Sequence, residues 1–185
     1  MYIEAQFTPN PAVMKFKVDN ANFTEKELIF DNRLQDGLPQ IIQELFSIES
    51  IVKIFVNNNF ISIEKDNKLP WECLQSDIIT IINNAFLGEY YYIDAEKYSK
   101  TEESNKELCD IGQKVEELLD SHIRHFLEQD GGNIQFHSFD EVTGTVVVTL
   151  QGACSGCPSS TTTIKDGVER ILTFHLDEVK AVEAI

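Results

Sequence analysis

Two cysteines stand three positions apart in the stretch GACSGCPSS, which covers residues 152–160. Their sulfur atoms, those of Cys154 and Cys157, could hold a metal ion or cluster, or could cycle between a dithiol and a disulfide. The N-terminal stretch shows no secretion signal. In such a chain a close cysteine pair is more often metal-binding or redox-active than a structural disulfide.

The setting of the pair favours thiolates. It follows the strand-like run TVVVTLQ and precedes an amphipathic helical pattern that Pro158 can begin. We therefore expect it at a helix N-terminus, where free N–H groups and the helix dipole stabilise negative charge. We also expect a loop exposed to solvent. The neighbours are small, which lets the backbone approach whatever the sulfurs hold: Gly152, Ala153, Ser155 and Gly156.

Three kinds of site are compatible with this pair. A [4Fe-4S] cluster or a structural zinc ion normally takes four protein ligands, and one chain offers two well-placed thiols. Two chains would supply four, so a cluster or a zinc ion shared across a homodimer satisfies the ligand count. A thiol-disulfide redox pair requires no second chain. The C-x-x-C spacing alone does not decide between them.

Composition excludes several classes of function. The formal net charge is -16, with 15 Lys+Arg against 31 Asp+Glu, and such a surface repels nucleic acids and anionic membranes. Partners are expected to be proteins, metal ions or small cations. No run of 18 apolar residues and no leader segment is recognised, which predicts a cytoplasmic protein, while a processed chain would have lost a transit peptide and an organelle origin stays open. The chain lacks Walker-type, G-x-G-x-x-G and supported Ser-His-Asp patterns, so we do not expect an enzyme.

The remaining candidate ligands have simpler interpretations. Cys73 lies in an amphipathic helical pattern and is expected to be a packed thiol, whereas Cys109 receives no role. The segment Asp130 to Gly132 reads as a helix C-cap and turn. His122 and His125 are three apart on a predicted helix and are interpreted as partly exposed helix residues. Two further histidines offer less: His137 and His175.

Hydrophobic periodicity predicts an α+β fold of two small domains. Residues 1–87 read as β-β-α-β-β-α, with strands in YIEAQF, VMKFKV, IVKIFV and FISIEK and helices in LPQIIQELFSI and PWECLQSDIITIINNAFLG. Residues 88–107 are charged and aperiodic and are predicted to be a linker, although three tyrosines in it could pack on the first domain.

Residues 108–185 read as α-β-β-α-β. The first helix is predicted from apolar residues near helical spacing: Leu108, Ile111, Val115, Leu118 and Phe126. It should end at Gly131 and Gly132. The strands are predicted in NIQFHSF, TVVVTL and DEVKAVEAI, and the cysteine pair lies between the second strand and the second helix.

The C-terminal part resembles a known family. DGGNI at residues 130–134, preceded by IRHFL and followed by LQGACSGCPSSTTTIKDGVE, resembles the C-terminal domain of Nfu, the NifU-like iron-sulfur cluster carriers. FTPNPAVMKF and PWECLQSDI resemble the separate N-terminal domain of that family. One departure is His125, where the family often has proline; it leaves the helix uninterrupted.

The resemblance implies that Cys154 and Cys157 bind a labile [4Fe-4S] cluster at a homodimer interface and pass it to apo-proteins. It implies a carrier rather than an enzyme, with the first domain engaging client proteins or upstream assembly factors. A [2Fe-2S] cluster remains an alternative. From the residues alone, a thiol-disulfide redox protein and a zinc-bridged interaction module also remain open.

Overall fold

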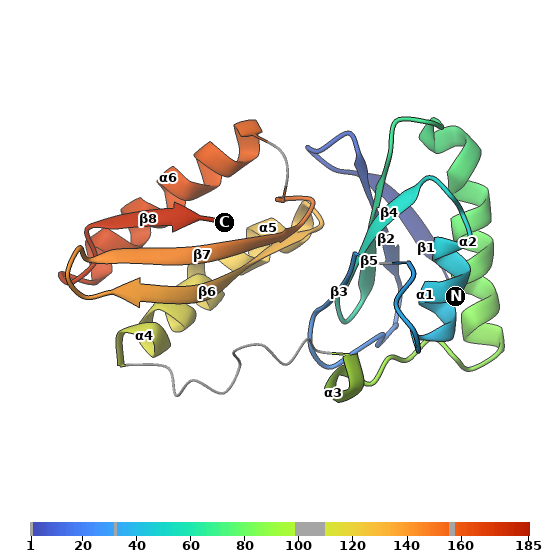
Figure 1. The fold of residues 1–185 in the computed structure, drawn as a ribbon, viewed down its shortest axis with the longest axis horizontal. Coiled ribbons are helices and arrows are strands. Elements are labelled where there is room, and N and C mark those ends of the chain that lie inside the picture. Colours follow the sequence, from blue (N-terminus) through green and yellow to red (C-terminus); the bar gives the residue numbers. More distant parts are fainter. Residues whose placement is uncertain (1, 32, 99–109, 156–157) are drawn as a thin grey trace. The chain divides into compact units, whose positions relative to one another are not determined.

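A computed structural model of the chain describes residues 2–31, 33–98, 110–155 and 158–185, the side chains of 158–161 excepted. The chain divides into two compact units, Met1–Lys100 and Thr101–Ile185 (Figure 1). Each unit combines one sheet with helices. The predicted α+β class is therefore confirmed.

The first unit is built on a five-stranded antiparallel sheet (Figure 1). Its strands are β1 (Ile3–Phe7), β2 (Val13–Val18), β3 (Leu28–Phe30), β4 (Ile51–Val56) and β5 (Phe60–Lys65), in the order β1-β2-β5-β4-β3. Alternation along the strands sends one set of apolar side chains to the core. There they meet α1 (Gln40–Phe46) and α2 (Trp71–Leu87). The predicted helices and four strands are confirmed, whereas β3, at three residues, is too short for its alternation to be recognised.

Residues 90–98 pack on the first unit, although the sequence analysis placed them in a linker. Tyr91 stacks on Phe86 with ring centroids 4.0 Å apart, and the Tyr90 hydroxyl donates to Glu44 Oε2 at 3.2 Å. The short helix α3 (Ala95–Tyr98) follows. A charged local composition conceals this packing, because Tyr90 bonds to Glu44, which is distant in the chain.

The second unit contains a three-stranded sheet with helices on one face. In chain order its elements are α4 (Asp110–Leu119), the π-helical turn η1 (Asp120–Arg124), α5 (His125–Gln129), β6 (Gly132–Asp140), β7 (Thr145–Gly152), α6 (Pro158–His175) and β8 (Ala181–Ala184). β7 lies between β6, to which it is antiparallel, and β8, to which it is parallel. The predicted order α-β-β-α-β is confirmed (Figure 1).

The first helical segment of this unit contains a π-helical turn that the sequence analysis did not foresee. Val115, Leu119, Ile123 and Leu127 are buried at intervals of four residues. A regular α-helix has 3.6 residues per turn, so such a stripe would drift round its surface. The wider turn η1 takes up the drift. The expectation that Phe126 lies on the packed stripe is wrong: 65% of it is exposed.

An arginine joins this helical segment to the sheet. Arg124 pairs with Glu116 and Asp120 and donates from Nε to the carbonyl of Ile134 at 3.0 Å. Glu116 in turn accepts the N–H of Phe136 at 2.8 Å. Burial of the guanidinium lowers the pKa of Arg124, but hydrogen bonds and charge from the two carboxylates outweigh it, and the pKa lies above its ordinary value.

Within the described part of the chain, no helix combines the length and the apolar character needed to cross a bilayer.

Candidate functional site

The predicted cysteine loop connects β7, which ends at Gly152, to α6, which begins at Pro158. The predicted position at a helix N-terminus is thus confirmed. Of the two predicted ligands, Cys154 lies among the described residues and Cys157 lies outside them.

A tight turn holds the first half of the loop. Gly152 adopts a φ of 61°, and its carbonyl accepts both the N–H of Ser155 at 3.1 Å and the Ser155 hydroxyl at 2.8 Å. The N–H of Cys154 donates to the carbonyl of Gln151 at 3.3 Å, and that of Ala153 to the carbonyl of Gly131 at 3.1 Å. The loop is therefore attached to the turn that follows α5.

The Cys154 side chain is buried, which corrects the expectation of an exposed loop. Only 3% of Cys154 is accessible, and it belongs to the hydrophobic cluster under α4 and α6. The small residues around it account for this burial, because they let the turn fold down onto the end of the sheet. In this conformation the thiol packs as a small apolar group.

Gly132 lies close to this sulfur. It pairs across the sheet with Gly152. A Cβ atom added to Gly132 would lie 2.3 Å from Cys154 Sγ and 2.9 Å from both the Cys154 nitrogen and the Gln151 carbonyl oxygen. Sequence reasoning explained Gly131 and Gly132 as a helix end, which fits the φ of 76° at Gly131. It missed the packing role of Gly132, since the contact arises only from strand pairing.

The other two cysteines, Cys73 and Cys109, are not part of this loop in the sequence. Cys73 is exposed on the first turn of α2. The prediction that it is packed is wrong, because its neighbours Trp71 and Leu74 occupy the buried face of the helix instead. Cys109 is outside the described residues. Among the described residues there is no group of three or more His, Cys, Asp or Glu side chains that could hold a metal ion.

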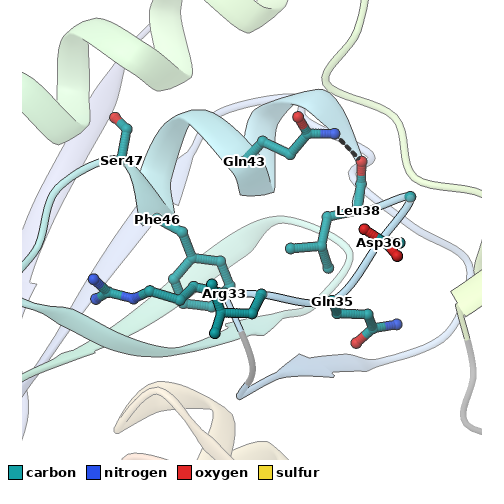
Figure 2. Close-up of a pocket in the computed structure, with 9 residues that line it drawn as sticks. Arg33, Gln35, Asp36, Leu38, Gln43, Phe46 and Ser47 are labelled. Carbon is teal, nitrogen blue, oxygen red and sulfur yellow. Dashed lines mark hydrogen bonds between the residues drawn. The ribbon is translucent and has the colours of Figure 1, made fainter.

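A hollow of about 370 Å³ in the first unit was considered as a second candidate (Figure 2). Two of its polar side chains, Arg33 and Gln43, are engaged by backbone carbonyls. The Arg33 guanidinium donates to the carbonyls of Glu49 and Ile51, and Gln43 Nε2 donates to the carbonyl of Leu38, as Figure 2 shows. These contacts stabilise the loop before α1 and do not aim groups at a ligand.

Two family models match different parts of the chain. Residues 3–88 match the family model "Scaffold protein Nfu/NifU N terminal", and residues 115–183 match "NifU-like domain". A solution structure of a NifU-like protein from Saccharomyces cerevisiae is 19% identical with a TM-score of 0.45, and the match covers 54% of this chain and 86% of that one.

Two curated relatives match along nearly the whole chain. "NifU-like protein 5, mitochondrial" of Arabidopsis thaliana is 30% identical, over 99% of this chain and 67% of the relative. "NFU1 iron-sulfur cluster scaffold homolog, mitochondrial" of Homo sapiens is 32% identical, over 100% of this chain and 72% of the relative. The chain spans about two thirds of the length of such relatives.

These relatives correct one prediction. The expected cytoplasmic location is wrong, because the matching proteins of Arabidopsis thaliana and Homo sapiens are mitochondrial. The reason is that an address can reside in a segment removed from the mature protein, so the composition of the folded part does not determine the compartment. Together, the two family matches and the relatives show that this chain belongs to the Nfu (NifU-like) family of iron-sulfur cluster scaffold proteins.

Proposed function

We propose that this protein carries a labile [4Fe-4S] cluster as its cargo, held by Cys154 and Cys157 from each of two chains and transferred to apo-proteins. The observation that carries the proposal is the position of Cys154. It lies on a glycine-flanked turn directly before α6, in a chain that belongs to a scaffold family. A cluster needs four ligands and the pair supplies two, so the loaded form is a homodimer.

The burial of Cys154 bears on how firmly the cargo is held. Its sulfur is covered by its own unit and must come out of the hydrophobic cluster before it can reach iron. A ligand that binds only a minor open conformation has its apparent affinity reduced by the population of that conformation. Opening of the turn therefore weakens retention. Weak retention suits a carrier, because acceptor thiols can then displace the cluster.

Hydrogen bonds within the turn oppose its opening. Four hydrogen bonds hold the closed conformation, two from Ser155, one from Cys154 and one from Ala153, and opening must break or rearrange them. Two of them converge on one carbonyl oxygen, that of Gly152. Transfer is ligand exchange at iron, with thiolates of the acceptor replacing those of the carrier. It requires no catalytic residue, in keeping with a carrier that is not an enzyme.

The test is anaerobic reconstitution with ferrous iron and sulfide, followed by visible absorption, iron and sulfide analysis and mass measurement on the same sample. We expect a brown dimer with one [4Fe-4S] cluster per two chains. Cys154→Ser and Cys157→Ser should lose the cluster and remain monomeric. Cys73→Ser is the matched control, because this exposed thiol belongs to the first unit and not to the unit that contains the loop. A full cluster in either loop variant would refute the ligand assignment.

The same samples separate the alternatives. A [2Fe-2S] cargo would give a different absorption spectrum with two irons per cluster. A zinc-bridged module would give a colourless dimer that contains zinc. A redox protein would remain a monomer and show a reversible two-electron thiol-disulfide couple. Transfer is then tested by mixing the loaded dimer with an apo-ferredoxin and following the acceptor's own spectrum.

A further inference from the structure

Two histidines from separate segments of the second unit face each other, outside the cysteine loop. His122 is on the π-helical turn η1 and His175 is the last residue of α6. Their ring centroids are 5.4 Å apart, with an angle of 45° between the ring planes. Both residues are exposed. The sequence suggested His122 and His125 as the closest pair, whereas the fold brings together residues 53 positions apart in the sequence.

The hydrogen bonds of Ser121 determine the tautomer of His122. The Ser121 hydroxyl has one proton and donates it to the carbonyl of Glu117 at 2.7 Å. The 2.7 Å contact between that hydroxyl oxygen and His122 Nδ1 must therefore have Nδ1–H as its donor. In the neutral ring, this leaves the lone pair on Nε2. A metal-binding histidine usually binds the metal through one ring nitrogen and donates the N–H of the other ring nitrogen to an oxygen atom.

The separation of the two rings fits coordination to a single ion. Zinc–nitrogen bonds are about 2.0–2.1 Å long, and a ring centroid lies about 1.1 Å behind its nitrogen, so each centroid would be about 3.2 Å from the metal. At a tetrahedral angle, two such rings have centroids about 5.2 Å apart. The observed separation of 5.4 Å is close to this value.

The surroundings favour a cation at this place. His175 ends an 18-residue helix, and the C-terminus of a helix carries partial negative charge. The ring of Phe174 meets that of His175 edge-on at 5.1 Å. The net charge of -16 attracts divalent cations to the whole surface.

We propose that His122 and His175 form a second metal site, for a borderline divalent transition-metal ion such as Zn²⁺, with water completing the coordination. Imidazole nitrogen is a ligand that suits zinc, copper and nickel. Among the described residues no third donor joins the pair. The site is therefore an open surface site, and it is independent of the cysteine loop.

The test is NMR of the histidine ring nitrogens in the ¹⁵N-labelled full chain at about pH 8, above the ordinary imidazole pKa. His122→Asn and His175→Asn assign the two resonance pairs. Before metal is added, His122 should show the Nδ1–H tautomer. On titration with Zn²⁺ the two rings should shift together and saturate at one equivalent, once any thiol sites are filled. His137, exposed on β6, is the matched control and should not change.

Variants of His122, His175 and Ser121 test whether the two rings bind the same ion. In His122→Asn, the His175 ring should lose its saturable response, and the converse variant should behave alike. Ser121→Ala should weaken zinc binding about 10-fold, because it removes the partner that orients His122. Repeating the titration with Cys154→Ser/Cys157→Ser should leave the histidine response unchanged. The proposal is overturned if the two rings respond with different midpoints, if neither responds, or if one responds fully without the other.

Discussion

Gly132→Ala should destabilise the second unit, because Gly132 lies close to Cys154. The added Cβ would lie 2.3 Å from Sγ and 2.9 Å from two backbone atoms, the Cys154 nitrogen and the Gln151 oxygen. Carbon atoms in good packing contact are about 3.5–4.0 Å from their neighbours. Rotation of the cysteine can relieve the first contact and cannot relieve the other two. The turn or the end of the β6–β7 ladder must therefore shift.

Overpacking of this kind costs about 1–3 kcal/mol. For a unit of about 85 residues, each kcal/mol lowers the melting temperature by roughly 4–8 °C, so we expect a decrease of about 4–24 °C in the transition of the second unit. Thermal and urea unfolding, followed by circular dichroism, measure it. Gly167→Ala is the matched control. This glycine is in α6 with no atom within 4 Å of the added Cβ, and alanine there should stabilise the helix by about 0.5–1 kcal/mol.

A double-mutant cycle then measures how much the contact with the Cys154 sulfur contributes to the destabilisation. Cys154→Ala alone removes a buried group and should cost about 1 kcal/mol while leaving the unit folded. If the sulfur contact contributes, Gly132→Ala/Cys154→Ala will be destabilised by less than the sum of the single variants. Additive costs would assign the effect to the backbone contacts alone. Gly132→Ala with the stability of the wild type would refute the close approach itself.

Two further predictions concern charged groups of the second unit. Arg124→Gln should lower the free energy of unfolding of this unit, measured in urea, by about 1.5–3 kcal/mol, because Glu116 and Asp120 lose a largely buried partner. Arg170→Gln is the control: this residue is exposed on α6, and its replacement should change the free energy of unfolding little. The pKa of Asp140 is lowered by the N–H of Val142 and by the hydroxyl of Thr143. The ionised carboxylate therefore stabilises the folded state at pH values above the unfolded-state pKa of about 3.9. This stabilisation is lost as the pH falls through the lower pKa of the folded state. Unfolding measured between about pH 5 and pH 2 should show a shallower acid loss for Asp140→Asn, and an identical profile would contradict this role.

Local patterns were enough to predict most elements. Alternation in VMKFKV and TVVVTL predicted strands that the structure confirms as β2 and β7. Pro158 and the glycines after α5 marked helix ends, because their effects on the backbone are local. The linker prediction depended on composition, and the packing of Tyr90 and Tyr91 follows the alternative that it left open. Periodicity placed Phe126 on the buried stripe, which is wrong because a π-helical turn changes the phase of the residues that follow it.

The sequence by itself determined the α+β class, the cysteine pair before a helix and the resemblance to Nfu proteins, because all of these depend on residue types within short stretches. Only the tertiary structure decided that Cys154 is buried against Gly132 and that His122 meets His175 instead of His125. These contacts depend on how strands pair and how helices pack on them. They join residues that are distant in the chain, so no local pattern contains them.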